Sequence, residues 1–163
     1  MQHPACIVNS IMKKSAQALS CDWKAKPLKE GKSDKSIIYR HKGNYRWEYI
    51  KTEAYKLKDG DWSRIIRRGL IGERLKAKSH VRYFEIARGG QSSFEKHRHE
   101  HIVIGIRGRG KVLLNRKSNK IGFLDIVYVS PNTEHQFSNP FKEPFGFLCI
   151  VPAKRDKPVL LNR

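Results

Sequence analysis

Cysteine is scarce in this chain of 163 residues, which carries three, Cys6, Cys21 and Cys149. They are odd in number, widely spaced and without a Cys-x-x-Cys motif. This pattern argues against a disulfide framework of the kind that stabilises small secreted domains, and favours a reducing compartment. It also argues against a structural zinc centre built on cysteine. We therefore expect a cytoplasmic protein.

Long apolar runs are absent as well. No segment approaches the roughly 20 apolar residues that a membrane-spanning helix needs. Residues 1–20 lack the continuous apolar stretch and the small-residue cleavage site of a secretory signal. They carry Ser and Lys but no acid, so an organelle presequence stays an alternative. We expect no membrane association.

Acidic side chains are few, 15 against 34 Lys and Arg, which gives a net charge of +19. Such an excess attracts nucleic acid, anionic membranes or acidic substrates. The basic residues are spread over the whole chain, and no arginine-rich arm, zinc finger or RNP motif gathers them. The composition therefore supports a solvated basic surface with weak, salt-sensitive attraction to polyanions, and not specific reading of nucleic acid.

Short extended runs separated by turn residues fill the chain from Ile37 onward, and no convincing amphipathic helix lies between them. This pattern predicts an antiparallel sandwich or barrel over residues 37–152. Residues 1–36 form an extension with a conceivable short helix at 9–19, and residues 153–163 a tail. The expected strands are 37–40, 47–56, 62–71, 80–87, 101–106, 112–115, 125–129, 135–138 and 145–151, with a turn at 115–119.

The most informative feature is the histidine cluster His97, His99 and His101, preceded by Glu95 and followed later by His135. In an extended strand alternate side chains share a face, so these groups can converge. Imidazole together with carboxylate suits first-row metals. Surface histidines are also common in basic sequences, but this run is entered from a Gly-Gly pair and continues into an apolar strand. The pattern indicates a metal site.

Two stretches carry a resemblance to a known family. Residues 89–110 resemble the first conserved motif of the cupin superfamily, with its glycine-bounded His-x-His. Residues 130–139 resemble the second motif and keep its histidine, His135, and its asparagine, Asn139. Two departures are His101, where the family usually has Glu, and Asn132 in place of Gly. The resemblance implies an all-β double-stranded β-helix, a small jelly-roll barrel, over residues 37–152.

The resemblance also implies a ligand set and leaves its fourth member open. Counting back from His101 without gaps places the family's His-x-His on Glu95 and His97, whereas matching the string itself selects His97 and His99. Both alignments keep His97, His101 and His135. We therefore expect these three, with His99 or Glu95 as the fourth, to bind a divalent transition metal: Fe, Mn, Ni, Co or Zn.

A small metal-binding cupin is expected to be a dioxygenase-like enzyme that acts on a small organic substrate, and to form a homodimer. No residue is assigned a catalytic role. The strand aromatics Tyr83, Tyr128 and Phe137 are candidates for the substrate pocket, although packing in the core is their ordinary role. Two alternatives are a non-catalytic sensor of a metal or small ligand, and a basic accessory protein that binds polyanions such as RNA.

Overall fold

The computed structural model describes residues 36–56 and 60–162, whose regular elements are strands apart from one short helix. The helix expected at 9–19 and the extension up to Lys35 lie outside the described residues. A short 3-10 helix, η2 (Glu73–Leu75), follows the second strand. The strands are β1 (Glu53–Ala54), β2 (Ser63–Ile71), β3 (Ser79–Gln91), β4 (Glu95–Lys96), β5 (His101–Arg107), β6 (Gly110–Leu114), β7 (Lys117–Ile121), β8 (Ile126–Val129), β9 (His135–Ser138), β10 (Phe145–Pro152) and β11 (Val159–Leu160).

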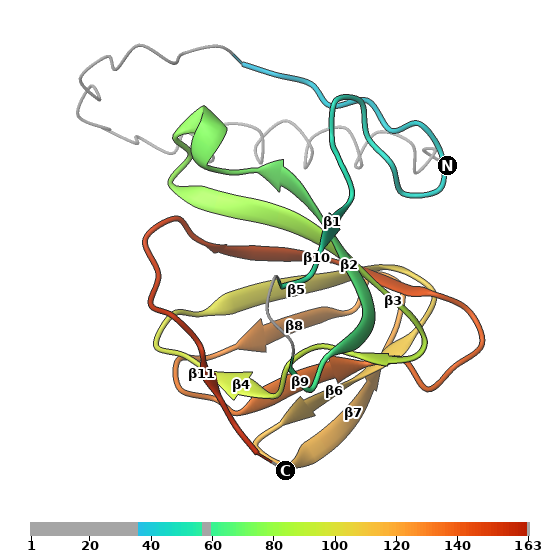
Figure 1. The fold of residues 1–163 in the computed structure, drawn as a ribbon, viewed down its shortest axis with the longest axis vertical. Helices are drawn as coiled ribbons and strands as arrows, with labels where there is room; N and C mark the ends of the chain where they lie inside the picture. The colour runs from blue at the N-terminus through green and yellow to red at the C-terminus, as the bar shows by residue number, and fades with distance from the viewer. Residues whose placement is uncertain (1–35, 57–59, 163) are drawn as a thin grey trace, which may run out of the picture. The chain divides into compact units, whose positions relative to one another are not determined.

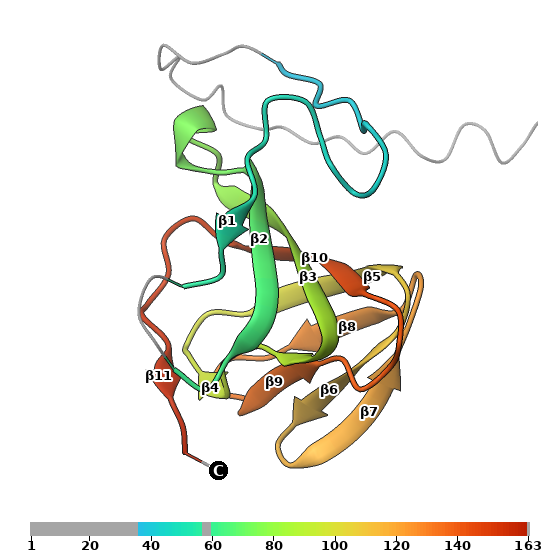
Figure 2. The ribbon, with the colours of Figure 1, turned by 45° about the vertical axis from the view of Figure 1, so that its right-hand side comes forward.

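The strands form one curled antiparallel sheet (Figure 1). Strand β3 pairs with β2 and β10, and its last residue, Gln91, pairs with Ser138 of β9. From β10 the sheet continues to β5 and β8, whereas β9 lies between β4 and β6. Figure 2 shows the same barrel turned by 45°. The architecture confirms the all-β jelly-roll barrel predicted from the sequence, and no helix in the described ranges is long and apolar enough to cross a membrane.

Two glycines let β3 take part in both layers of the curled sheet, the one that carries β2, β10, β5 and β8 and the one that carries β4, β9, β6 and β7. Gly89 has φ +73°, a conformation that side chains with a Cβ adopt at a cost. A Cβ on Gly90 would lie 2.7 Å from the backbone oxygen of Ser63. The strand therefore bends at this pair, and its last residue reaches β9 in the opposite layer.

The core fills the space between the layers. Along β10 alternate residues face inward, so that Phe145, Phe147, Cys149 and Val151 are buried. The ring of Phe147 stacks on Phe137 of β9, with ring centroids 4.9 Å apart. Each buried Phe contributes about 1.5–3 kcal/mol, so this contact across the barrel holds the layer that carries β9 against the layer that carries β10.

Most of the strands follow the predicted pattern, and three predictions are wrong. Residues 37–40 form no strand. Of the strand expected over 47–56, only β1 (Glu53–Ala54) forms. The reversal expected at 115–119 takes two residues, Asn115 with φ 43° and Arg116 with φ 68°, after which Lys117 begins β7. A two-residue reversal with positive φ at both positions matches the twist of the flanking strands. Because glycine is absent from this turn, its shortness could not be predicted from the residue pattern.

Candidate metal centre

Three buried histidines converge at one end of the barrel. Each of His97, His101 and His135 offers a ring nitrogen, and the three atoms lie within 4.8 Å of one another. The residues are 3%, 8% and 2% exposed. Two nitrogens bound to one ion by bonds of about 2.0–2.1 Å lie at most about 4.2 Å apart. A small inward shift of the rings therefore brings all three nitrogens within reach of a single ion.

Strand ends bring the three rings together. His101 is the first residue of β5 and His135 the first residue of β9. Strand β4 lies beside β9 with Glu95 opposite His135, which places His97, two residues after Glu95, near the same point. The segment from 95 to 101 is not one continuous strand as expected, because it bends at Arg98–His99. The imidazoles are therefore brought together by the pairing of β4 with β9 and by the bend at Arg98–His99. They do not alternate along a single strand, as the sequence had predicted.

Backbone oxygens fix the orientation of two rings. Nδ1 of His97 donates to the carbonyl oxygen of His99 at 2.7 Å, and Nδ1 of His135 donates to the carbonyl oxygen of Thr133 at 2.9 Å. A carbonyl oxygen only accepts, so the proton of each neutral ring sits on Nδ1 and Nε2 carries the lone pair. Nε2 of His97 is buried and has no hydrogen-bond partner. A metal-binding histidine has this arrangement: one ring nitrogen donates to a backbone carbonyl, which fixes the ring, and the other is free to bind the ion.

The electrostatics keep these rings neutral near pH 7. Burial, reinforced by the neighbouring His135 and His99, lowers the pKa of His97 to about 4. Burial likewise lowers the pKa of His101 and of His135. A ring must be deprotonated to bind a metal, so protons do not compete for this site at neutral pH.

The two candidates for the fourth position differ in their contacts. Nε2 of His99 lies 3.2 Å from Nε2 of His101, close to the roughly 3.0–3.4 Å that separates neighbouring ligands with bonds of about 2.1 Å. Nδ1 of His99 donates to Oδ1 of Asp156 at 2.8 Å, so its Nε2 is left as an acceptor. Glu95 is buried, but its Oε2 already accepts from Lys56 Nζ and Ser93 Oγ, each at 2.6 Å.

Asp156 holds His99 in place. Its carboxylate accepts the backbone N–H groups of Arg98 and His99 as well as the His99 ring. These bonds, the one from Arg98 foremost, lower the pKa of Asp156, so the side chain is ionised at neutral pH. Asp156 follows β10, in the segment that leads to β11. The C-terminal segment thus supports the bend that carries His99.

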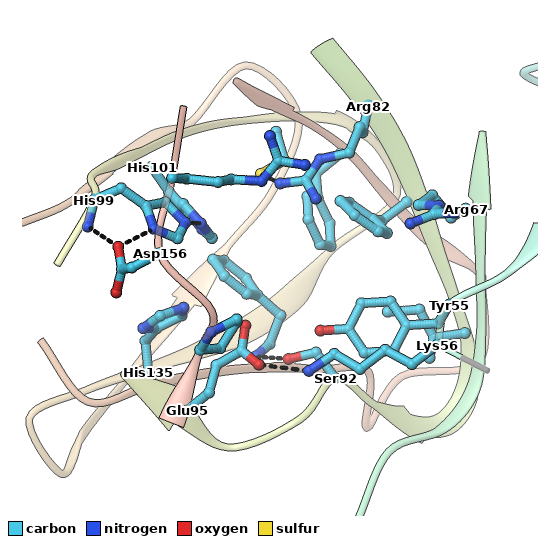
Figure 3. Close-up of a pocket in the computed structure, with 17 residues that line it drawn as sticks. Tyr55, Lys56, Arg67, Arg82, Ser92, Glu95, His99, His101, His135 and Asp156 are labelled. Carbon is cyan, nitrogen blue, oxygen red and sulfur yellow. Dashed lines mark hydrogen bonds and ion pairs between the residues drawn. The ribbon is translucent and has the colours of Figure 1, made fainter. Parts of the chain in front are cut away.

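A cavity of about 220 Å³ opens beside the histidines (Figure 3). His99, His101 and His135 line it, together with an apolar wall of Phe84, Phe137 and Phe147. Glu95, Tyr55 and the sulfur-bearing Cys149 also face it. Burial raises the pKa of the Cys149 thiol and that of the Tyr55 hydroxyl, so both groups are protonated at neutral pH.

The three aromatics proposed for the pocket take different places. Phe137 lines the cavity. Tyr83 points away from it, stacks on Tyr45 with ring centroids 5.7 Å apart and donates to Glu85 at 2.6 Å. Tyr128 is 55% exposed and donates to Glu100. Of these three predicted residues, only Phe137, which lies on the same face of β9 as His135, therefore faces the candidate site.

Several cavity residues are not among the site residues expected from the sequence, among them Arg82, Cys149, Arg155 and Asp156. For Arg82 there was a signal, because it shares parity on β3 with the buried His80 and Phe84, and an arginine on an inward face is unusual. For Asp156 the local sequence offered none, since its partners lie nearly sixty residues away.

Comparison with known proteins decides the family. Residues 82–151 match the family described as cupin domain. The chain is 36% identical, over 71% of its length and 74% of the relative, to a protein of Rhodospirillum rubrum named 1-methylthio-D-xylulose 5-phosphate methylsulfurylase. The chain belongs to the cupin superfamily. This confirms the resemblance drawn from the two histidine motifs.

Solved structures agree on the fold of this cupin. A cupin-2 domain protein of R. rubrum is 34% identical, with a TM-score of 0.67 over 77% of this chain and 84% of that chain. A cupin 2 conserved barrel protein of Rhodopseudomonas palustris is 31% identical, with a TM-score of 0.71 over 77% and 87%. The polyketide cyclase RemF of Streptomyces resistomycificus, 17% identical with a TM-score of 0.67 over 78% and 87%, shares the fold alone.

Proposed function

We propose that this cupin is a metal-dependent enzyme whose ion is held by Nε2 of His97, His101 and His135, with His99 as the fourth ligand. One observation carries the proposal: the three rings are buried, their ligand nitrogens meet within 4.8 Å, and the Nε2 of His97 is left without any other partner. We place His99 before Glu95 because its Nε2 lies 3.2 Å from that of His101, whereas Glu95 is engaged by Lys56.

A divalent Fe, Mn, Ni, Co or Zn ion bound here supplies Lewis acidity toward an oxygen of the substrate. Four neutral imidazoles leave the full charge on that ion. The apolar wall of Phe84, Phe137 and Phe147 keeps water away from the reacting groups. Glu95, which lines the cavity, is the carboxylate at hand to take or return a proton, and Lys56 and Ser93 hold its Oε2 by hydrogen bonds.

The substrate class we propose is a small phosphorylated sugar derivative. The R. rubrum relative is named for 1-methylthio-D-xylulose 5-phosphate, and the cavity here is lined by cations, Lys56, Arg67, Arg82 and Arg155. A buried site with several cations suits an anionic substrate. The dioxygenase-like reaction expected from the sequence stays a prediction, which oxygen uptake by the metal-loaded protein tests. So does the homodimer, which sedimentation equilibrium tests.

The metal requirement is tested by elemental analysis of the freshly purified protein beside the variants His135→Ala and His41→Ala. His41 is exposed and does not line the cavity, so it controls for the loss of a histidine. We expect close to one ion per chain in the wild type and in His41→Ala, and little in His135→Ala. Equal metal content in all three would remove His135 from the site, and no metal in the wild type, even after incubation with each ion, would contradict the proposal.

The substrate class is tested with 1-methylthio-D-xylulose 5-phosphate on the metal-loaded protein, with phosphorus NMR and mass spectrometry to follow its conversion. We expect turnover by the wild type and none by His135→Ala. Tight binding without turnover would favour the sensor alternative. If the protein neither binds nor converts this compound, it is excluded as the substrate.

A further inference from the structure

Arg82 and Arg155 are the cavity's cations that lack an acidic partner. Lys56 pairs with Glu95 at 2.6 Å and Arg67 pairs with Glu53 at 2.7 Å. In the part of the chain that the structure describes, no carboxylate lies within ion-pair distance of Arg82 or Arg155. Two positive charges therefore face one cavity without a carboxylate of the described residues in direct contact with either of them.

Arg82 is held in weakly polar surroundings. Its guanidinium lies 5.3 Å from the centre of the Phe84 ring, and its Nη2 contacts the sulfur of Cys149 at 3.6 Å, a weak acceptor. Its Nε is buried and has no hydrogen-bond partner. A buried donor left without a partner is costly, so the protein itself satisfies the guanidinium of Arg82 poorly.

Arg155 is held at the cavity by groups that leave much of its fork free. Its Nη1 donates to Nδ1 of His80 at 3.0 Å and to the carbonyl oxygens of Pro152 and Ala153 at 3.2 and 3.3 Å. Burial, followed by the charge of Arg82, lowers the pKa of Arg155, as expected of two guanidinium groups that lie near each other. In Figure 3 Arg82 lies along the wall of the cavity that also carries His101, across from Glu95 and Lys56.

We propose that Arg82 and Arg155 form an anion subsite that binds the phosphoryl group of a phosphate monoester, while the rest of that substrate reaches the histidines. The proposal rests on the proposed function and names the part of the site that recognises the phosphate. Planar guanidinium groups match phosphoryl oxygens in paired hydrogen bonds. A phosphate monoester at neutral pH also carries nearly two negative charges, which balance the two unpaired arginines.

Calorimetric titration with inorganic phosphate tests the subsite in the metal-loaded wild type, Arg82→Gln, Arg155→Gln, Arg88→Gln and His135→Ala. Arg88→Gln is the matched control, because it removes the same charge from an exposed position on the same strand as Arg82. We expect Arg82→Gln and Arg155→Gln each to lose about tenfold to a hundredfold in phosphate affinity, at unchanged metal content. Arg88→Gln should stay within about twofold of the wild type.

His135→Ala separates this proposal from the metal proposal. If the arginines bind phosphate, His135→Ala keeps most of the phosphate affinity although it loses the ion. Phosphate affinity that disappears in His135→Ala and survives in Arg82→Gln would mean that phosphate sits on the metal, which overturns the subsite and leaves the metal site standing. A wild type without metal would overturn the proposed function, whereas the dependence on Arg82 could still be measured.

Two further measurements keep the test decisive. If Arg82→Gln does not fold, Arg82→Lys retains the charge without the planar fork and should still bind phosphate more weakly than the wild type. Acetate serves as the carboxylate probe and should bind more weakly than phosphate. Equal affinity for acetate and phosphate would overturn the assignment to a phosphoryl group.

Discussion

The ion pair between Lys56 and Glu95 provides a quantitative test of how the site is built. Lys56 lies shortly after β1, and its Nζ contacts Glu95 Oε2 at 2.6 Å and Ser93 Oγ at 2.8 Å. The Glu95 side chain is 8% exposed and that of Lys56 27%. We predict that Lys56→Met destabilises the protein because it leaves a buried carboxylate without a cation, and that Glu95→Gln costs less.

The magnitudes follow from burial. Removing one partner of a buried pair costs about 3–5 kcal/mol, and the partial exposure of Lys56 places this case near the lower end of that range. Glu95→Gln keeps the hydrogen bond to Ser93 and frees a lysine that can reach water, so about 1–2 kcal/mol is expected. In the double variant the unpaired charge disappears, which predicts a coupling energy of about 1–3 kcal/mol.

Urea unfolding of the two single variants and the double variant measures this coupling. The surface pair of Lys42 with Glu48, whose side chains are 60% and 25% exposed, is the control, and Lys42→Met should cost less than about 1 kcal/mol. A coupling energy below about 0.5 kcal/mol between Lys56 and Glu95 would show that the two side chains do not stabilise each other as a buried ion pair. Metal analysis of Glu95→Gln adds a second test, because a lost ion would make Glu95 the fourth ligand in place of His99.

Asp156→Asn should weaken metal affinity by about 10–100-fold, measured by competition with a chelator; unchanged affinity would show that the carboxylate does not orient His99. His80→Gln should change the pH dependence of stability. Burial and the charge of Arg155 lower the pKa of His80 in the folded protein. Below about pH 6.5 the unfolded chain therefore binds a proton at His80 that the folded chain does not, and the free energy of unfolding decreases as the pH is lowered. Melting at pH 7.5 and 5.5 should show the variant gaining on the wild type at the lower pH, and the opposite sign contradicts this. Gly105→Ala should abolish soluble folded protein, because its Cβ would lie 1.9 Å from the Gly122 backbone oxygen; a circular dichroism spectrum like that of the wild type would refute the clash.

The fold was within reach of the sequence because its signals are local. Alternation along β10 and the turn residues between short apolar runs identify most of the strands. The two histidine motifs identify the superfamily, and the convergence of His97, His101 and His135 follows from the barrel that the motifs imply. The residue pattern was therefore sufficient to predict most of the strands and the cluster of imidazole rings.

The remaining features depend on contacts between distant segments. Residues 153–163 were expected as a tail, yet Arg155 and Asp156 line the cavity and β11 pairs with β4. No local pattern shows that Asp156 caps the bend at Arg98 and His99. Tyr83 was a candidate for the pocket because of its ring, but the register of β3 turns it toward Tyr45 on the outer face. Such choices are made by tertiary packing.

X-ray diffraction from metal-loaded crystals, recorded at the absorption edge of the ion, locates the ion relative to the histidine rings. We expect an anomalous peak within about 2.2 Å of the Nε2 atoms of His97, His101 and His135. A peak elsewhere, or full occupancy of an ion that one of these three rings does not touch, would contradict it.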